Sequence, residues 1–117
     1  MLCQRYYYRL KSTGGNYPFG FAQCYNTIQA GGLTPYPVTM RTAPSALEQS
    51  GTAADYRLYT ASGAGEVCSA VPTYAAVVTT TAYGAVNYTV AANLVGGDVT
   101  QPHGVNSSAY LGWSAEL

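Results

Sequence analysis

The last ten residues of the chain alternate almost perfectly between apolar and polar side chains. One face carries Ala109, Leu111, Trp113, Ala115 and Leu117, and the other carries Ser108, Tyr110, Gly112, Ser114 and Glu116. A period of two is typical of a β-strand with one buried side. Residues 3–11 are rich in tyrosine and are also expected to form a strand. Their more apolar face consists of Gln4, Tyr6, Tyr8 and Leu10. Strands at both ends predict a compact all-β module.

Composition supports this fold class. Tyr occurs 12 times, Thr and Val are frequent, and such aromatic and β-branched side chains suit a half-buried sheet surface. The 13 Gly and 6 Pro supply many turns. At 117 residues, the chain has the length of one domain, which we expect to span 1–117. We predict an antiparallel β-sandwich, jelly-roll-like, with about eight strands.

Turn residues divide the chain into the remaining predicted elements. After the first strand, the expected strands and extended segments cover 19–28, 35–41, 55–60, 66–70, 71–81, 86–92 and the residues from about 106 onward. Gly31-Gly32 is expected to break a strand, and residues 96–104 read as a polar loop. Ser45–Gln49 is the one place where a helical turn is expected, with Ser45 as cap and Glu48 three residues on.

Low charge constrains the surface. Only 9% of residues are charged and the formal net charge is zero, so a lone monomer would have little charge repulsion to keep it in solution. We therefore expect other chains to cover part of the surface. An ordinary neutral surface rich in Ser, Thr and Asn is the alternative.

Several partner classes are disfavoured by the same composition. Five cationic residues lie scattered or in the group Arg5, Arg9 and Lys11, which argues against nucleic-acid binding. No apolar run approaches roughly 18 residues, so we expect no membrane insertion. The N-terminal residues lack the charged and apolar regions of a secretory signal.

The three cysteines are Cys3, Cys24 and Cys68. Their spacing contains no CxxC element and one histidine accompanies them, so we predict no metal site. We interpret them as small buried hydrophobic residues of a protein that folds in a reducing cytoplasm. A disulfide between Cys3 and Cys24 is the alternative.

The residues that catalysis requires are few and dispersed. His103 is the one histidine and lies in a Gly/Pro segment with no partner near it in sequence. The carboxylates are far apart along the chain, at Glu48, Asp55, Glu66, Asp98 and Glu116. None of the glycine pairs precedes a helix in a phosphate-binding pattern. We expect a protein that is not an enzyme and has no cofactor, and a small carbohydrate-active enzyme is the minor alternative.

Binding is better supported than catalysis, because tyrosines and amides on loops can stack on sugar rings and hydrogen-bond to their hydroxyls. The candidate ligand-binding residues, each beside turn residues and expected to be exposed, are Asn16, Tyr17, Tyr36, Tyr83, Asn93 and His103. The alternative is that most of these tyrosines belong to the core or to subunit contacts.

Three segments in order resemble a known family. Cys3–Tyr8 is similar to its "CQRYY" start, and Pro37–Arg41 with Ala43-Pro44 is similar to its "PVxMRxxP" segment. Ala109–Leu117 is similar to its closing "AYLGFSAEL" strand. The family is the C-terminal module of bacteriophage tail-fibre and other virion proteins. Because Met1 lies directly before the first motif, we expect either a trimmed C-terminal module or a small stand-alone virion protein.

The resemblance implies a non-enzymatic β-sandwich that decorates a virion or ends a fibre, often as a trimer. It favours a distal receptor-binding domain of a tail fibre that contacts host surface glycan, with a capsid decoration protein as the alternative. The expected partners are copies of the chain itself, as a homotrimer, and other virion proteins. The expected location is the virion, assembled in the host cytoplasm. Arg5, Arg9 and Arg41 are candidate subunit-interface residues, because Arg bonds carboxylates and carbonyls and stacks on Tyr; solvated pairing is the alternative.

Overall fold

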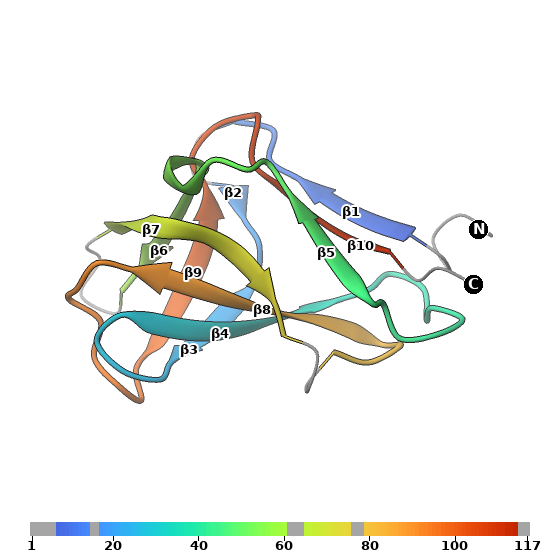
Figure 1. Cartoon of the computed structure of the whole chain (residues 1–117), viewed down its shortest axis with the longest axis horizontal. Coiled ribbons are helices and arrows are strands. Elements are labelled where there is room, and N and C mark those ends of the chain that lie inside the picture. The colour runs from blue at the N-terminus through green and yellow to red at the C-terminus, as the bar shows by residue number, and fades with distance from the viewer. Residues whose placement is uncertain (1–6, 15–16, 61–64, 76–78, 115–117) are drawn as a thin grey trace.

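The computed structural model describes residues 7–14, 17–60, 65–75 and 79–114. Within these ranges the regular elements are antiparallel β-strands and one short 3-10 helix, η2 (Ala53–Asp55) (Figure 1). The strands are β1 (Tyr7–Lys11), β2 (Tyr17–Pro18), β3 (Phe21–Cys24), β4 (Gln29–Pro35), β5 (Ala46–Gln49), β6 (Tyr56–Tyr59), β7 (Gly65–Tyr74), β8 (Tyr83–Val90), β9 (Val99–Gly104) and β10 (Tyr110–Ser114). The predicted all-β, antiparallel fold class is confirmed.

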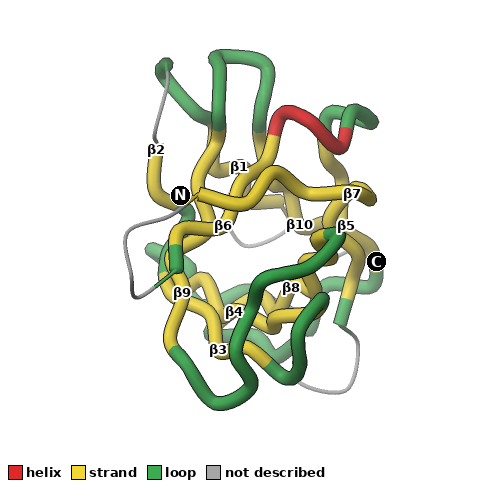
Figure 2. The backbone as a smooth tube through the Cα atoms, turned by 90° about the vertical axis from the view of Figure 1, so that its left-hand side faces the viewer, coloured by secondary structure: helices red, strands yellow, loops and turns green. Residues whose placement is uncertain are grey.

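Six strands form a closed barrel. The predicted jelly-roll-like sandwich is therefore not clearly what the structure shows. The six strands pair in the order β9-β3-β4-β8-β7-β6, and β6 pairs back to β9 to complete the ring (Figure 2). Two irregularities of the kind that bend a sheet occur in and beside this ring. The β7–β8 register shifts at Cys68/Ala70 and Ala70/Thr73, and Gly20, with φ of +127°, makes a corner between β2 and β3.

A smaller sheet, in the order β1-β10-β5, packs beside the barrel (Figure 1). Its central strand contains the C-terminal alternation, and Leu111 and Trp113 are fully buried together with Ala109 just before it. Tyr8 and Leu10 of β1 and Leu47 of β5 pack against the same core. The predicted buried faces of both end strands are therefore confirmed for the described residues; positions 3–6 and 115–117 lie outside them.

One core is shared by the barrel and the smaller sheet. The barrel contributes large buried side chains that include Tyr56, Leu58, Val86, Tyr88 and Val90. At the junction Trp113 contacts two tyrosine rings: it stacks on Tyr8, with centroids 6.1 Å apart and planes at 8°, and meets Tyr36 edge-on at 5.6 Å. This aromatic cluster joins strands β1 and β10 to the loop after β4.

The predicted helical turn over Ser45–Gln49 is wrong, because β5 occupies it and pairs with β10. Leu47, opposite Trp113 in the register, packs on the core. This tertiary contact overrides the local capping preference.

The glycine pair Gly31-Gly32 was expected to end a strand but lies in the middle of β4. A Cβ at Gly31 would lie 1.8 Å from the Tyr25 hydroxyl oxygen, and one at Gly32 would lie 3.0 Å from the Phe21 carbonyl oxygen. These glycines make room for neighbouring groups and do not form a turn.

Phe19 and Phe21, which would share a face if 19–28 were one regular strand as predicted, point in opposite directions. Phe19 is buried in the core, whereas Phe21 is exposed on the outside of the barrel. The positive φ of Gly20 between them interrupts the period of two. From Phe21 onward the alternation holds, with Ala22 and Cys24 buried.

Three further boundaries differ from the prediction. Residues 66–70 and only the first part of 71–81, up to Tyr74, form the single strand β7. The expected extended segment 35–41 is not a strand, because β4 ends at Pro35. The predicted polar loop 96–104 contains β9, whose inward residues are Thr100, Pro102 and Gly104. These residue types do not mark a buried strand face in a sequence.

Candidate functional site

An open groove of about 760 Å³ lies on the outer face of the barrel, across β3, β4 and β8. Strand register explains its shape, because residues opposite one another point to the same side of a sheet. One row runs from Phe21 through Leu33 to Ala85. The adjacent row runs from Val99 through Gln23 and Gly31 to Asn87. The groove is thus built from outward positions of neighbouring strands.

Large apolar side chains line this groove. Those with exposed fractions between 37% and 67% are Phe21, Tyr25, Leu33, Tyr83 and Val99. A contiguous exposed apolar surface rimmed by polar groups marks an interaction site more often than scattered exposed residues do. The groove is therefore the candidate functional site of the described residues.

Tyr25 extends over the strand rather than away from it. Its hydroxyl lies where a Cβ of Gly31 would be, so the glycine leaves space for the phenol ring. The chain after it turns tightly, since the Asn26 side-chain oxygen accepts hydrogen bonds from the backbone N–H groups of Ile28 and Gln29, each 2.9 Å long. This turn positions the ring at one end of the groove.

Two amide side chains, Gln23 and Asn87, accompany the aromatic rings in the groove lining. Amides offer both hydrogen-bond donors and acceptors. Apolar walls with a few polar groups suit either the apolar face of a sugar ring or an apolar segment of another protein. Chemically, the groove is a binding surface.

The predicted ligand-binding residues are only partly brought together. Tyr83 lines the groove, whereas Asn93 lies beyond the other end of β8, a strand about 23 Å long at 3.3 Å per residue. Asn93 has a φ of 76°, and its side-chain amide donates to Glu66 Oε1 over 3.2 Å. Asn16 lies outside the described residues.

Tyr36 is a correction, because it was expected to be exposed and is buried, with an exposed fraction of 9%. Its backbone N–H donates to the carbonyl of Ala82, which turns the loop inward, and its ring packs against Tyr8 and Trp113. Prolines on both sides made it look like a loop residue. Tyr36 is therefore a core residue, which was the alternative considered for the candidate tyrosines.

Tyr17 and His103 lie on neighbouring strands. Tyr17 of β2 is half-buried and its ring contacts that of Phe19, with centroids 5.9 Å apart. His103 was expected in a loop but lies on β9, opposite Pro18 of β2 and Arg57 of β6. Its side chain lies on the outer face, away from the groove lining.

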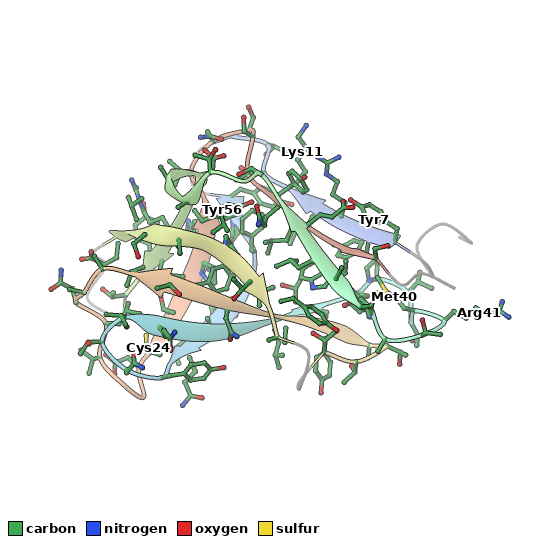
Figure 3. All side chains as sticks on the ribbon, viewed as in Figure 1. Tyr7, Lys11, Cys24, Met40, Arg41 and Tyr56 are labelled. Atoms are coloured by element: carbon green, nitrogen blue, oxygen red, sulfur yellow. The ribbon has the colours of Figure 1, made fainter. Side chains whose placement is uncertain are left out.

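The candidate interface arginines are surface residues where the structure describes them. The Arg9 guanidinium lies 4.0 Å above the ring of Tyr110, on the outer face of the smaller sheet. Arg41 extends from the loop between β4 and β5, at the end of the molecule that also holds Met40 (Figure 3). Arg5 lies outside the described residues.

The carboxylates of Glu48 and Asp55 are held in separate structural contacts. Glu48 accepts a hydrogen bond from the Tyr7 hydroxyl over 2.9 Å. Asp55, which is buried, accepts from the Ser50 hydroxyl at 2.7 Å and from the Asn106 amide at 2.8 Å. In the described ranges, no three His, Cys, Asp or Glu side chains gather closely enough to hold a metal ion.

Cys24 and Cys68 are buried free thiols, as the preferred interpretation of the cysteines predicted. Burial raises the pKa of the Cys68 thiol to about 12 and also raises that of Cys24. Both thiols therefore stay protonated near neutral pH and act as small apolar side chains. Cys3 lies outside the described residues.

The sequence prediction missed Phe21, Tyr25, Leu33 and Val99 as site residues. Large apolar side chains at Phe21 and Tyr25 alternate with the small Ala22 and Cys24. Once the small side chains are recognised as the core face, the large ones must lie outside. The alternation of large and small side chains could therefore have identified Phe21 and Tyr25 as surface residues.

Comparison of the chain with protein-family models, with curated proteins and with solved structures gave no match. Across the described residues, the structure contains no helix with the length and apolar character needed to cross a membrane.

Proposed function

We propose that this chain is a non-enzymatic module of a bacteriophage virion, the distal receptor-binding domain of a tail fibre, and that its outer groove contacts host surface glycan. Two independent lines support the proposal. The three matched sequence segments resemble the phage module, and the exposed aromatic groove supplies a binding surface. The groove is the observation that carries the binding role.

Glycan binding suits the groove because a sugar has both an apolar C–H surface, which aromatic rings can contact, and hydroxyl groups, which amides can bond. Tyr25, Tyr83 and Phe21 offer ring surfaces to the apolar C–H face of a sugar, and Gln23 and Asn87 can bond hydroxyls. Strands β3 and β8 position four of these residues and Tyr25 directly follows β3, so little conformational entropy is lost on binding.

The proposal also includes the oligomeric state and the location of the chain. We expect the chain to act as a homotrimer in contact with other virion proteins, located in the virion after assembly in the host cytoplasm. A 9% charged composition suits packing between identical copies, and Arg9 and Arg41 lie on the exposed surface where such contacts would form. The proposal needs an all-β module; a jelly-roll-like sandwich, the finer fold that the number and spacing of the expected strands suggest, stays a prediction.

A capsid decoration protein is the second candidate. The mainly apolar character of the exposed groove residues favours it, since such a surface also packs well against protein. Locating the chain on intact particles by electron microscopy separates the two: a few copies at the tail tip support the fibre domain, and many copies on the capsid support decoration.

The groove itself is tested with the double variant Tyr25→Ser/Tyr83→Ser. Both side chains are exposed, so the fold should be preserved. Losing two ring contacts should weaken binding to a bacterial surface polysaccharide about tenfold or more. Val95→Ser is the matched control, since Val95 is exposed but does not line the groove. Equal binding by the double variant and the wild type would refute the groove as the glycan site.

A further inference from the structure

A second group of polar side chains lies on the outer face where β6 and β9 pair. We call Arg57, Tyr59, Gln101 and His103 the β6–β9 patch. Arg57 is opposite His103 in the register and Tyr59 is opposite Gln101. The intervening pair, Leu58 and Pro102, is fully buried, so the period of two directs the four patch residues outward.

The four side chains contact one another in a continuous chain. Arg57 Nη1 donates to the Tyr59 hydroxyl oxygen over 3.3 Å. The rings of Tyr59 and His103 pack with centroids 4.6 Å apart. His103 Nε2 lies 2.5 Å from Gln101 Oε1, and because that oxygen can only accept, Nε2 carries the proton. The patch is therefore an organised surface.

Two buried nitrogen atoms of the patch have no hydrogen-bond partner: Arg57 Nε and His103 Nδ1. The acidic residue closest in register, Glu66, pairs with Leu58 and so lies on the other face, where it accepts from Asn93. A guanidinium N–H that is shielded from water without a partner is costly. A negatively charged oxygen atom bound here would satisfy it.

We propose that the β6–β9 patch binds an oxyanion, the carboxylate group of an acidic sugar. The guanidinium plane of Arg57 bonds carboxylates in a two-pronged manner. Protonated His103 would donate from Nδ1 while Nε2 remains bonded to Gln101, and the Tyr59 hydroxyl adds a polar contact. No bond is made or broken; the site recognises charge and shape.

The position of the patch relates it to the groove. β9 carries Val99 at the edge of the groove, and Gln101 and His103 follow at alternate positions on the same face. Val99 and His103 are four residues apart, about 13 Å along a strand. An acidic oligosaccharide could thus contact groove and patch together; this extension rests on the proposed function, whereas oxyanion binding at the patch does not.

Binding should be coupled to protonation of His103. Burial and the charge of Arg57 lower the pKa of His103 below its usual 6.5, so the ring is neutral near pH 7. Among the described residues, the groups facing it are Arg57 and Tyr59 from β6, Gln101 from β9 and Pro18 from β2. A bound anion opposes the charge of Arg57 and favours the protonated ring, so it raises the pKa and binds more tightly at lower pH.

His103 is the one histidine in the chain, so an NMR titration of its ring reports on the patch without overlap. The probes are glucuronate, inorganic phosphate and, as a neutral control, glucose, each added to the full chain. Glucuronate should raise the pKa of His103 and bind about tenfold more tightly at pH 5.5 than at pH 8. Glucose should leave the titration unchanged.

Variants assign the binding to the patch. Arg57→Gln should abolish the shift, and His103→Gln should keep weak binding but lose its pH dependence. Arg9→Gln is the matched control, because Arg9 also lies over a tyrosine ring, 4.0 Å from that of Tyr110, but on the other sheet. It should bind as the wild type does.

Three outcomes would overturn the proposal: no shift with either anion, an equal loss of binding in Arg57→Gln and Arg9→Gln, or binding of phosphate without glucuronate. The last would assign the oxyanion to a phosphorylated ligand. None of these outcomes affects polysaccharide binding by the groove, whose Tyr25→Ser/Tyr83→Ser test is separate.

Discussion

The hydroxyl group of Tyr56 donates a hydrogen bond of 2.7 Å to the carbonyl oxygen of Tyr110, which connects β6 of the barrel to β10 of the smaller sheet. The same hydroxyl accepts from the backbone N–H of Ser50 over 2.9 Å, at the end of β5. One buried side chain thereby holds three separate segments together. Tyr56 fixes the position of the smaller sheet against the barrel.

Tyr56→Phe should lower the free energy of unfolding by about 2 kcal/mol, because partly buried backbone groups of Ser50 and Tyr110 lose their partner. Urea unfolding followed by circular dichroism measures the change. Tyr17→Phe is the control, since Tyr17 is only half-buried, and it should change stability by less than about 0.5 kcal/mol. Equal losses in the two variants would contradict the role of Tyr56.

Gly84→Ala should destabilise the junction of the two sheets. The added Cβ would lie 2.2 Å from Trp113 Nε1 and 2.7 Å from the Tyr36 hydroxyl oxygen, and neither fully packed ring can move freely. Overpacking of this kind costs about 1–3 kcal/mol. Thermal unfolding measures the loss, and the fluorescence of the single tryptophan should shift as Trp113 is displaced.

The control for this substitution is Gly14→Ala, where an added Cβ meets no atom within 4 Å. It should unfold at nearly the wild-type temperature. A Gly84→Ala protein as stable as this control would show that the space above Gly84 is larger than the structure indicates.

Alkaline pH should unfold the protein through its tyrosines. Burial, with a smaller effect of the hydrogen bond to Glu48, raises the pKa of Tyr7 to about 12. Burial also raises the pKa values of Tyr8, Tyr36 and Tyr88 above their usual 10.0. These protons are bound more tightly in the folded state, so their stabilising effect is complete below pH 10 and is lost as the pH rises beyond it.

The measurement is a phenolate titration by absorbance at 295 nm, beside urea unfolding at pH 9 and pH 11. Stability should be lower at pH 11, and a fraction of the tyrosines should ionise only when the chain unfolds. Tyr7→Phe should reduce the difference between the two pH values. Simultaneous ionisation of all tyrosines in the folded protein at pH 10 would be incompatible with these pKa shifts.

Local patterns predicted the end strands well. The alternation of Ala109, Leu111 and Trp113 identified a buried face correctly, because successive side chains of a strand point to opposite faces of the sheet. The same rule failed at Phe19 and Phe21, where a positive φ at Gly20 reverses the direction of the side chains. It also failed at β9, whose inward residues are not typical of a core.

The candidate site was harder to predict than the fold class. Tyr83 and Tyr36 were both expected to be exposed; Tyr83 is exposed and Tyr36 is buried, because both lie beside turn residues and only the tertiary path of the chain separates them. Phe21 and Leu33 meet through the β3–β4 register, which no local feature specifies.

By itself, the amino-acid sequence determined the all-β class and the buried faces of the terminal strands, since both follow from residue type and a period of two. Only the tertiary structure decided that the larger sheet closes into a barrel, that Tyr25 lies over Gly31, and that Arg57 meets His103 from 46 positions away. The physical reason is that each strand edge can hydrogen-bond to any other, so pairing is selected by how all the side chains fill one shared core.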